Sequence, residues 1–473
     1  DNKRSLPCII DGLKVSHRKI LYCAFKKNLK NEIRVAQFAG YVSENGGYHH
    51  GEASLQGAIV NMGQDFVGSN NIPLLEPIGQ FGSRIMGGSD SAQPRYIHTK
   101  LPDIIPHIYN KDDFNILDYI DDDGHLVEPE FYAPIIPMLL VNGSEGIGTG
   151  WSTYIPSYNP LDIIDNLKIL LKSKNVDDEE LIEMKPWYRG FTGNIEKMTD
   201  TCYISYGSYK KINNSQVEIK ELPIRSWTDK YKEFLESMII DNSKDKKSKQ
   251  YLRNYTSQCT DNKVHFTLTF ASDVLEDITE DTTRNSEGQN KFEKLFKLTS
   301  KINTGNMVLY NEKGYLKKYN NVSDILKNYF KVRLSLYAKR KVYQLNSLKQ
   351  ELVVVNAKVR FIMEFIEGKI IISNRSKKNL IEQLVEANYP TVNEDKEFGY
   401  LIKMPIYNLT KERIEELKKD RDIKTEMFDN LDKTSETQLW LSELELLKKE
   451  YLKFLDLKKS NEEDDGHKKK KII

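Results

Sequence analysis

The chain has 473 residues, with 70 Lys and Arg against 69 Asp and Glu, so its formal net charge of +1 gives no sign of a polyanionic partner. Hydrophobic residues make up 39% and charged residues 29%, which excludes a disordered or collagen-like chain and predicts a folded protein of roughly two to four domains. The longest apolar run, 131–141, is shorter than the about 20 residues of a membrane span, so no membrane partner is expected.

The cysteines and the first residue bear on where the protein works. Cys8, Cys23, Cys202 and Cys259 lie far apart and form no CxxC pair, which favours a reduced intracellular protein without a zinc ribbon or disulfide framework. Because the sequence opens on Asp1 with neither an initiator Met nor a signal peptide, we expect a piece of a longer polypeptide.

Near-neutrality conceals a segregated charge distribution. Residues 1–37 hold nine bases and three acids, a local charge of +6, whereas residues 103–130 hold nine acids and one base, a local charge of −8. Salt screens exposed charges beyond a Debye length of about 8 Å. A ligand that touches only the opening stretch therefore meets a basic surface.

Residues 1–136 predict a winged-helix module. A first helix is expected from an N-cap at Ser16 to about Leu29, with a cationic face, and a second from Glu52 to Phe66. A β-prone run follows at 95–99. Small helices followed by a strand and loop are typical of winged-helix folds.

The remaining chain predicts an α+β domain followed by a long helical arm. Residues 137–322 alternate strand-like and helical pieces, and from 323 to 368 apolar residues recur in steps of three and four without Pro, as in a coiled coil. We expect a small globule at 369–408, a return arm at 409–456, and a charged, disordered tail at 457–473.

Pro94-Arg95-Tyr96 is the strongest chemical suggestion among the motifs. A phenol has a pKa near 10, so only about one in a thousand is ionised at pH 7, and a tyrosine nucleophile needs cationic help. An adjacent arginine could stabilise both a phenolate and a phosphate under attack. In a regular strand Arg95 and Tyr96 would point to opposite faces, so sharing one phosphate requires a twist of the backbone. Taken alone, the dipeptide is a weak signal, and a structural tyrosine is its default interpretation.

His49 and His50 come just before the second predicted helix. Adjacent side chains diverge and no third ligand is near in sequence, which disfavours zinc. The unpaired N–H groups and dipole of a helix N-terminus favour an anion there. A phosphate contact and simple local packing both remain open.

Six segments, in order and at matching spacing, make the chain resemble the DNA breakage-reunion core of the eukaryotic-type DNA topoisomerase II (type IIA) family. They are DNKRSLP at 1–7, DGLK at 11–14, YHHGE at 48–52, FVGSNNI at 66–72, PRYI at 94–97 and LVNGSEGIGTGW at 140–151. Weaker similarity continues through PWYRG at 186–190, NMV at 306–308 and LTKER at 409–413. The resemblance covers most of the chain and is weakest over 240–300, the globule and the tail.

The resemblance implies a fold and a role for individual residues. It implies a winged-helix DNA-binding domain at 1–136, an α/β tower at 137–322, and a long antiparallel coiled coil with a small helical exit-gate domain. Tyr96 matches the nucleophile that becomes joined to a DNA 5′ phosphate, and Arg95 its transition-state partner. Arg4 and His50 match residues that hold the scissile phosphate, and Ile147 matches a side chain that wedges between base pairs. Expected DNA-backbone contacts are Lys14, Arg18, Lys19 and His49.

The resemblance also implies binding partners, cofactors and a cellular location. Family members use double-stranded DNA, a homodimer, Mg²⁺ and ATP, with the metal and nucleotide held by Toprim and ATPase domains upstream, and a nuclear location is expected. No GxxxxGK[ST] phosphate loop is present here. Val15-Ser16-His17 departs from the family pattern. The alternatives are a non-catalytic dimeric DNA-binding protein with a coiled-coil arm, and a purely structural coiled-coil protein.

Overall fold

In a computed structural model, residues 2–177, 179–239, 251–279, 282–373, 375–392, 395 and 397–470 are described. The chain divides into two compact units: unit 1 comprises residues 1–333 and 443–473, and unit 2 comprises residues 334–442. The mixed α+β class expected from the sequence is confirmed. No helix in the described ranges is both long and apolar enough to cross a membrane.

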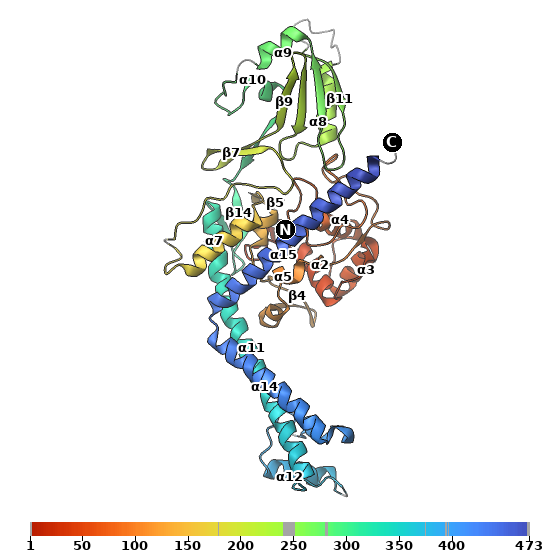
Figure 1. The fold of residues 1–473 in the computed structure, drawn as a ribbon, viewed down its shortest axis with the longest axis vertical. Helices are drawn as coiled ribbons and strands as arrows, with labels where there is room; N and C mark the ends of the chain where they lie inside the picture. Colours follow the sequence, from red (N-terminus) through yellow and green to blue (C-terminus); the bar gives the residue numbers. More distant parts are fainter. Residues whose placement is uncertain are drawn as a thin grey trace. The chain divides into compact units, whose positions relative to one another are not determined.

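Three helices form the first part of unit 1. Helices α2 (Val15–Lys26), α3 (Val35–Asn45) and α4 (Glu52–Gly63) pack against one another, as Figure 1 shows. Helix α2 begins one residue before the predicted cap Ser16, so that prediction is wrong; Lys14 occupies the N-cap position without a side-chain hydrogen bond. The helix ends at Lys26, because Asn28 is left-handed (φ 49°) and Leu29 N–H bonds back to Ala24.

The predicted strand at 95–99 is mostly a turn. Only β2 (His98–Thr99) pairs, antiparallel to β1 (Ile33–Arg34), while residues 94–96 turn. Pro94 has no backbone N–H and cannot donate a hydrogen bond to a neighbouring strand, so the paired strand begins only after it. The other short elements here are α1 (Asn2–Ser5), α5 (Ile105–Ile108), η1 (Lys111–Ile116), α6 (Met138–Asn142) and α7 (Pro160–Lys172), with two hairpins, β3 (Tyr119–Asp122)–β4 (His125–Pro129) and β5 (Ser144–Ile147)–β6 (Ser152–Ile155).

Among its described residues, the later part of unit 1 contains three antiparallel sheets. Their strand orders are β13-β8-β7, β11-β12-β10-β9 and β14-β15. The strands are β7 (Asn194–Thr199), β8 (Cys202–Tyr206), β9 (Ser208–Asn213), β10 (Gln216–Glu221), β11 (Leu252–Ser257), β12 (Phe266–Phe270), β13 (Thr299–Asn303), β14 (Met307–Tyr310) and β15 (Leu316–Tyr319). Helices α8 (Thr228–Ile239), α9 (Ser272–Thr279) and α10 (Lys291–Leu295) accompany them.

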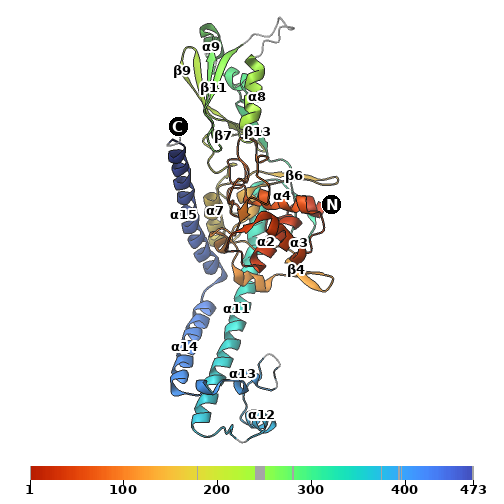
Figure 2. The same ribbon diagram turned by 90° about the vertical axis from the view of Figure 1, so that its right-hand side faces the viewer.

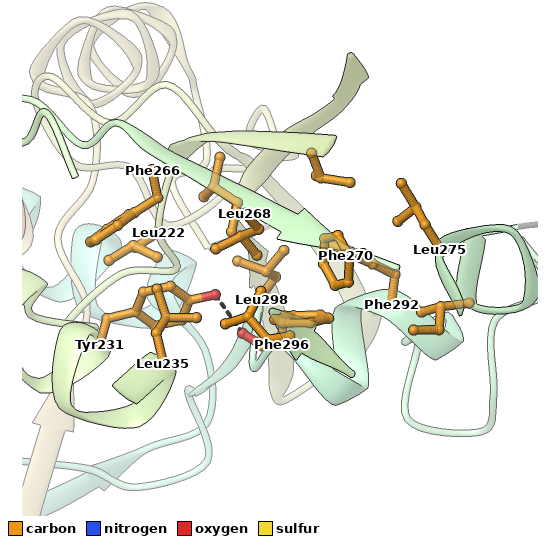
Figure 3. Close-up of a cluster of buried hydrophobic side chains, with 14 of the residues drawn as sticks. Leu222, Tyr231, Leu235, Phe266, Leu268, Phe270, Leu275, Phe292, Phe296 and Leu298 are labelled. Carbon is orange, nitrogen blue, oxygen red and sulfur yellow. Dashed lines mark hydrogen bonds between the residues drawn. The ribbon is translucent and has the colours of Figure 1, made fainter. Parts of the chain in front are cut away.

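The four-stranded sheet buries an aromatic core, drawn in Figure 3. Phe266, Phe270, Phe292 and Phe296 are almost fully buried in one cluster. Strand β12 alternates buried and half-buried residues, which is the period-2 pattern of a strand with one face on the core. The Tyr231 hydroxyl donates to the Phe296 carbonyl at 2.8 Å, which satisfies the polar atom that this ring brings into the core.

Unit 2 contains most of the long helix α11 (Val322–Ile366), the helix α14 (Lys411–Lys433) and the short elements between them. Helix α11 has 45 residues, close to the predicted first arm. Figure 2 shows α14 alongside it, where Val355, Val359 and Ile362 pack against Ile414 and Leu417. Between these helices lie α12 (Lys377–Glu386), α13 (Gly399–Ile402) and η2 (Ile406–Asn408).

The predicted return arm, 409–456, comprises α14 and the first part of α15 (Glu436–Lys470). Helix α15 starts anew at Ser435, whose hydroxyl accepts from Gln438 N–H while the Gln438 side chain accepts from Ser435 N–H. The predicted disordered tail is helical to Lys470, since no proline interrupts the backbone hydrogen bonds of α15. Residues 471–473 lie outside the described residues.

Replacing Phe266 with Ala is expected to lower the free energy of unfolding of the sheet region by about 3–5 kcal/mol, because a fully buried ring leaves a cavity. Denaturant unfolding followed by hydrogen exchange of β12 and α8 measures it. Leu126→Ala, at a side chain 63% exposed, is the control and should change stability by less than about 0.5 kcal/mol. Equal midpoints for both variants would contradict this core.

Candidate functional site

Tyr96 lies in a turn that is bonded to the first turn of helix α3. Tyr96 N–H donates to Gln93 at 2.9 Å, and the carbonyls of Pro94 and Ile97 accept from Ala36 and Val35. Ile97 is buried, whereas the Tyr96 side chain is 66% exposed. The α3 N-terminus and the Ile97 anchor therefore present the phenol to solvent on a fixed backbone.

The turn brings Arg95 onto the ring of Tyr96. The Arg95 guanidinium carbon lies 4.8 Å from the ring centroid. In a regular strand the Arg95 and Tyr96 side chains would point to opposite faces. The turn at 94–96 supplies the backbone twist that brings them together. The arrangement joins an oxygen nucleophile to a fork of N–H donors that fits phosphate oxygens, a combination suited to attack on a phosphodiester.

A second group of predicted residues lines one pocket of about 650 Å³. It brings together Arg4 from α1, His49 and His50 before α4, and Lys19 from α2, opposite the acidic Glu128. Helix α4 begins at Glu52 as predicted, and both histidines are exposed. Neither Tyr96 nor Arg95 is among the lining residues. The exposed Arg4 and the two exposed imidazoles of this pocket can bind an anion next to a helix N-terminus.

Three predicted DNA-backbone contacts are engaged inside the protein. Arg18 is buried: its Nε donates to Asp11 at 2.7 Å and its Nη2 to Asp11 and the Leu13 carbonyl, each at 3.1 Å. The prediction that Arg18 contacts the DNA backbone is therefore wrong. The helical pattern places Arg18 on the polar face of the helix, but its partner Asp11 lies in the turn just before α2. Lys19 donates to Gly46 O and Glu128, and Lys14 donates to the Glu145 carbonyl at 2.7 Å.

Ile147 ends strand β5 of the β5–β6 hairpin and is 87% exposed. Burying an apolar side chain is favourable, so a fully exposed isoleucine at a hairpin tip marks a contact surface when other apolar side chains lie close by. Trp151, beyond the turn of the same hairpin, is also exposed. Figure 2 shows this hairpin and the β3–β4 hairpin projecting from the same side of unit 1.

Sequence reasoning missed Glu145 and Arg225 as partners. Arg225 Nη1 donates to Glu145 Oε2 at 2.5 Å, across 80 positions of the chain. No spacing rule links two such distant residues, although Glu145 lies within the segment matched at 140–151. A metal site was not expected, and no group of three His, Cys, Asp or Glu among the described residues could hold a metal ion. The four cysteines, all described, are unpaired.

His17, one of the departures from the family pattern, lines a polar pocket with Lys14, Asn142 and Glu145. Burial of the imidazole, and then the charges of Lys14 and Arg18, lower the pKa of His17 to about 4. His17 is therefore neutral at physiological pH in the folded protein. The sequence marked this position only as unusual.

Comparisons with known proteins agree on one family. A family model for DNA gyrase/topoisomerase IV matches residues 4–445. DNA topoisomerase 2 of Arabidopsis thaliana is 41% identical over 97% of this chain and 32% of that protein, and DNA topoisomerase 2-alpha of Cricetulus griseus is 40% identical over 98% and 31%. The chain thus spans about a third of the length of these relatives. A crystal structure of the Plasmodium falciparum topoisomerase II DNA-binding, cleavage and re-ligation domain matches with a TM-score of 0.88 and 39% identity, over 98% of this chain and 64% of that one.

Acidification should destabilise the protein partly through His17. Its folded-state pKa of about 4 lies below the ordinary value near 6.5, so the unfolded chain binds the proton first. Stability present above pH 6.5 is lost as the pH falls toward 4, by about 3 kcal/mol. His17→Gln should remove this part of the loss, and the exposed His125→Gln should not. Unfolding midpoints between pH 7.5 and 4 measure it; identical pH profiles for His17→Gln and the unmodified chain would refute the assignment.

Proposed function

The chain belongs to the DNA gyrase/topoisomerase IV family, and on that premise we propose that it is the DNA breakage-reunion region of an ATP-dependent type II DNA topoisomerase. The whole enzyme would cut both strands of one duplex, pass a second duplex through the break and rejoin the ends, changing supercoiling and resolving catenanes. The observation that carries the proposal is the exposed Tyr96 phenol beneath the Arg95 guanidinium.

The proposed reaction is a reversible transesterification. The Tyr96 oxygen loses its proton and attacks a DNA phosphorus, a phosphotyrosyl bond to the 5′ phosphate forms, and the bond from phosphorus to the 3′ oxygen breaks. That oxygen takes up a proton, and religation reverses each step with no change of oxidation state. Arg95 stabilises the negative charge that develops on the phosphate oxygens. One strand would be cut by each protomer of a homodimer.

DNA would lie across the face that carries the basic pocket and the β5–β6 hairpin. Arg4, His49 and His50 would contact phosphates, since they are exposed and line one pocket. Ile147 would enter between base pairs, where unstacking a step permits the bend that wraps more protein surface. Lys14 and Lys19 would act mainly by holding this surface in place, because their ammonium groups already have internal partners.

The domain divisions predicted from the sequence form part of the same proposal. Residues 1–136 would be the winged-helix domain, 137–322 the tower, 323–368 and 409–456 the coiled-coil arms, and 369–408 the exit gate. Mg²⁺ and ATP would be bound by other regions of the whole enzyme, because the described residues offer no cluster of metal ligands and the sequence has no phosphate loop. We propose a nuclear location, since the relatives compared are eukaryotic topoisomerases.

Tyr96→Phe is expected to abolish covalent attachment to DNA, because phenylalanine keeps the ring beneath Arg95 and lacks the nucleophilic oxygen. The chain is joined to the upstream regions of a relative, mixed with supercoiled DNA and Mg²⁺, and quenched with denaturant. Protein linked to DNA 5′ ends is then measured. Tyr315→Phe, at another exposed tyrosine, is the control. An unmutated protein that forms no adduct would favour the non-catalytic DNA-binding alternative.

Sedimentation at low concentration tests the homodimer. The chain should sediment as a dimer through its exit gate, residues 369–408, as the resemblance implies. Exposed apolar residues in this region, such as Tyr407 at 77% exposure, offer a contact surface. Tyr407→Asp should weaken association, whereas Lys418→Asp, at an exposed position on α14, serves as the control. A monomer at micromolar concentration would contradict the gate.

A further inference from the structure

Strand β5, which carries Ile147, has a single strand partner. Among the described residues it pairs only with β6. Strand β6 is fastened to the chain around β14: Tyr154 N–H donates to the Asn306 carbonyl at 2.9 Å and Thr153 Oγ1 accepts from Val308 N–H at 3.1 Å. An isolated two-stranded hairpin is marginally stable. The direction of Ile147 therefore depends on the groups that hold β5 from the side.

Two cations hold β5 at one residue, Glu145. The Lys14 ammonium donates to its carbonyl at 2.7 Å, and the Arg225 guanidinium donates to its carboxylate at 2.5 Å. Side chains alternate along a strand, so Glu145 and Ile147 lie on the same face, and both are exposed. On the opposite face a Cβ at Gly146 would come 2.0 Å from the Ser5 carbonyl oxygen, so α1 packs closely there.

Arg225 also covers the residue that lies across the hairpin from Glu145. The register of the hairpin pairs Glu145 with Tyr154, and the Arg225 guanidinium carbon lies 5.2 Å from the Tyr154 ring centroid. One guanidinium thus binds a carboxylate on β5 and a ring on β6. Cross-strand pairs are the units that stabilise a hairpin, and Arg225 joins the two members of this one.

The backbone presents Arg225 from a firm anchor between β10 and α8. Ile224 is buried with Tyr188, Tyr203 and Ile302, and its N–H donates to Ser205 Oγ at 3.2 Å. Arg225 itself has φ +64°, a left-handed conformation that is unfavourable for a residue with a Cβ. Such conformations persist where the surrounding structure over-determines them, often at functional sites. Arg225, which contacts the β5–β6 hairpin, is the residue in this strained conformation.

We propose that Arg225 is a positioning residue for the DNA wedge: by holding Glu145 and Tyr154 it ties the β10–α8 segment to the β5–β6 hairpin and fixes the direction in which Ile147 enters the duplex. The inference rests on the proposed function of Ile147. Arg225 acts through the hairpin and makes no phosphate contact of its own. Loss of the contact lowers DNA bending and leaves the number of neutralised phosphates unchanged.

The test measures two quantities on residues 1–473 with a short duplex labelled at both ends. Energy transfer at saturating protein reports the bent fraction, and the salt dependence of affinity reports phosphate contacts. Arg225→Ala and Glu145→Gln should each lower the bent fraction about two- to fivefold, as the loss of an exposed ion pair allows. The double variant should bend no less than either single variant, and exchanging the two charges by Arg225→Glu with Glu145→Arg should restore part of the loss.

The matched control is the ion pair of Arg284 with Glu196. Its side chains are 42% and 43% exposed, against 41% and 62% for Arg225 and Glu145, and Arg284 also covers a ring, that of Tyr206. Arg284→Ala should leave bending unchanged. Equal melting temperatures of the variants show that they fold.

Two results would overturn the positioning role of Arg225 and leave the proposed role of Ile147 intact. If Ile147→Ala lowers bending while Arg225→Ala and Glu145→Gln do not, Arg225 does not position the wedge. If Arg225→Ala reduces the salt slope by about one, it is a phosphate ligand. By contrast, full bending in Ile147→Ala, which leaves the Arg225 contact intact, would overturn the wedge itself and the positioning role with it.

Discussion

The buried pair of Asp11 and Arg18 is the interaction on which the first part of unit 1 depends. Asp11 accepts from Arg18 and from the backbone N–H groups of Leu13 and Tyr132, so one carboxylate joins the opening turn, helix α2 and the segment after β4. Burying two charges is costly unless geometry and additional hydrogen bonds compensate, and all of these contacts are present. The pair fixes the start of α2, and with it Lys14, which reaches the β5–β6 hairpin.

In the candidate site the two proposed functional side chains are exposed, and neighbouring residues that are bonded or packed fix their positions. Tyr96 and Ile147 are exposed, yet each is one or two residues from an anchored position: Ile97 in the core beside Tyr96, and Glu145 on β5 before Ile147. A side chain that is this exposed has no packing of its own to orient it. Its direction comes from neighbours that are bonded to the rest of the fold.

The charge of the opening stretch overstates the cations that face solvent. Its local charge of +6 includes Lys14, Arg18 and Lys19, and these three bind the Glu145 carbonyl, Asp11 and Glu128. Counting charges therefore did not identify which cations are accessible at the surface. Arg4, one of the nine counted bases, and the two histidines, which lie outside the counted stretch, line one pocket from exposed positions.

The amino-acid sequence by itself determined the approximate positions of α2, α4 and α11, whose apolar residues recur every three to four positions, the start of α4 at Glu52, and the adjacency of Arg95 and Tyr96, but it did not indicate α3. The six short segments that match the family in order and spacing also indicated the family. Only the tertiary structure decided that 94–96 turns, that Arg18 is internal, and that Arg225 meets Glu145. Local patterns record periodicity and chain neighbours, whereas these contacts join residues 7 to 80 positions apart, whose meeting depends on how the elements pack.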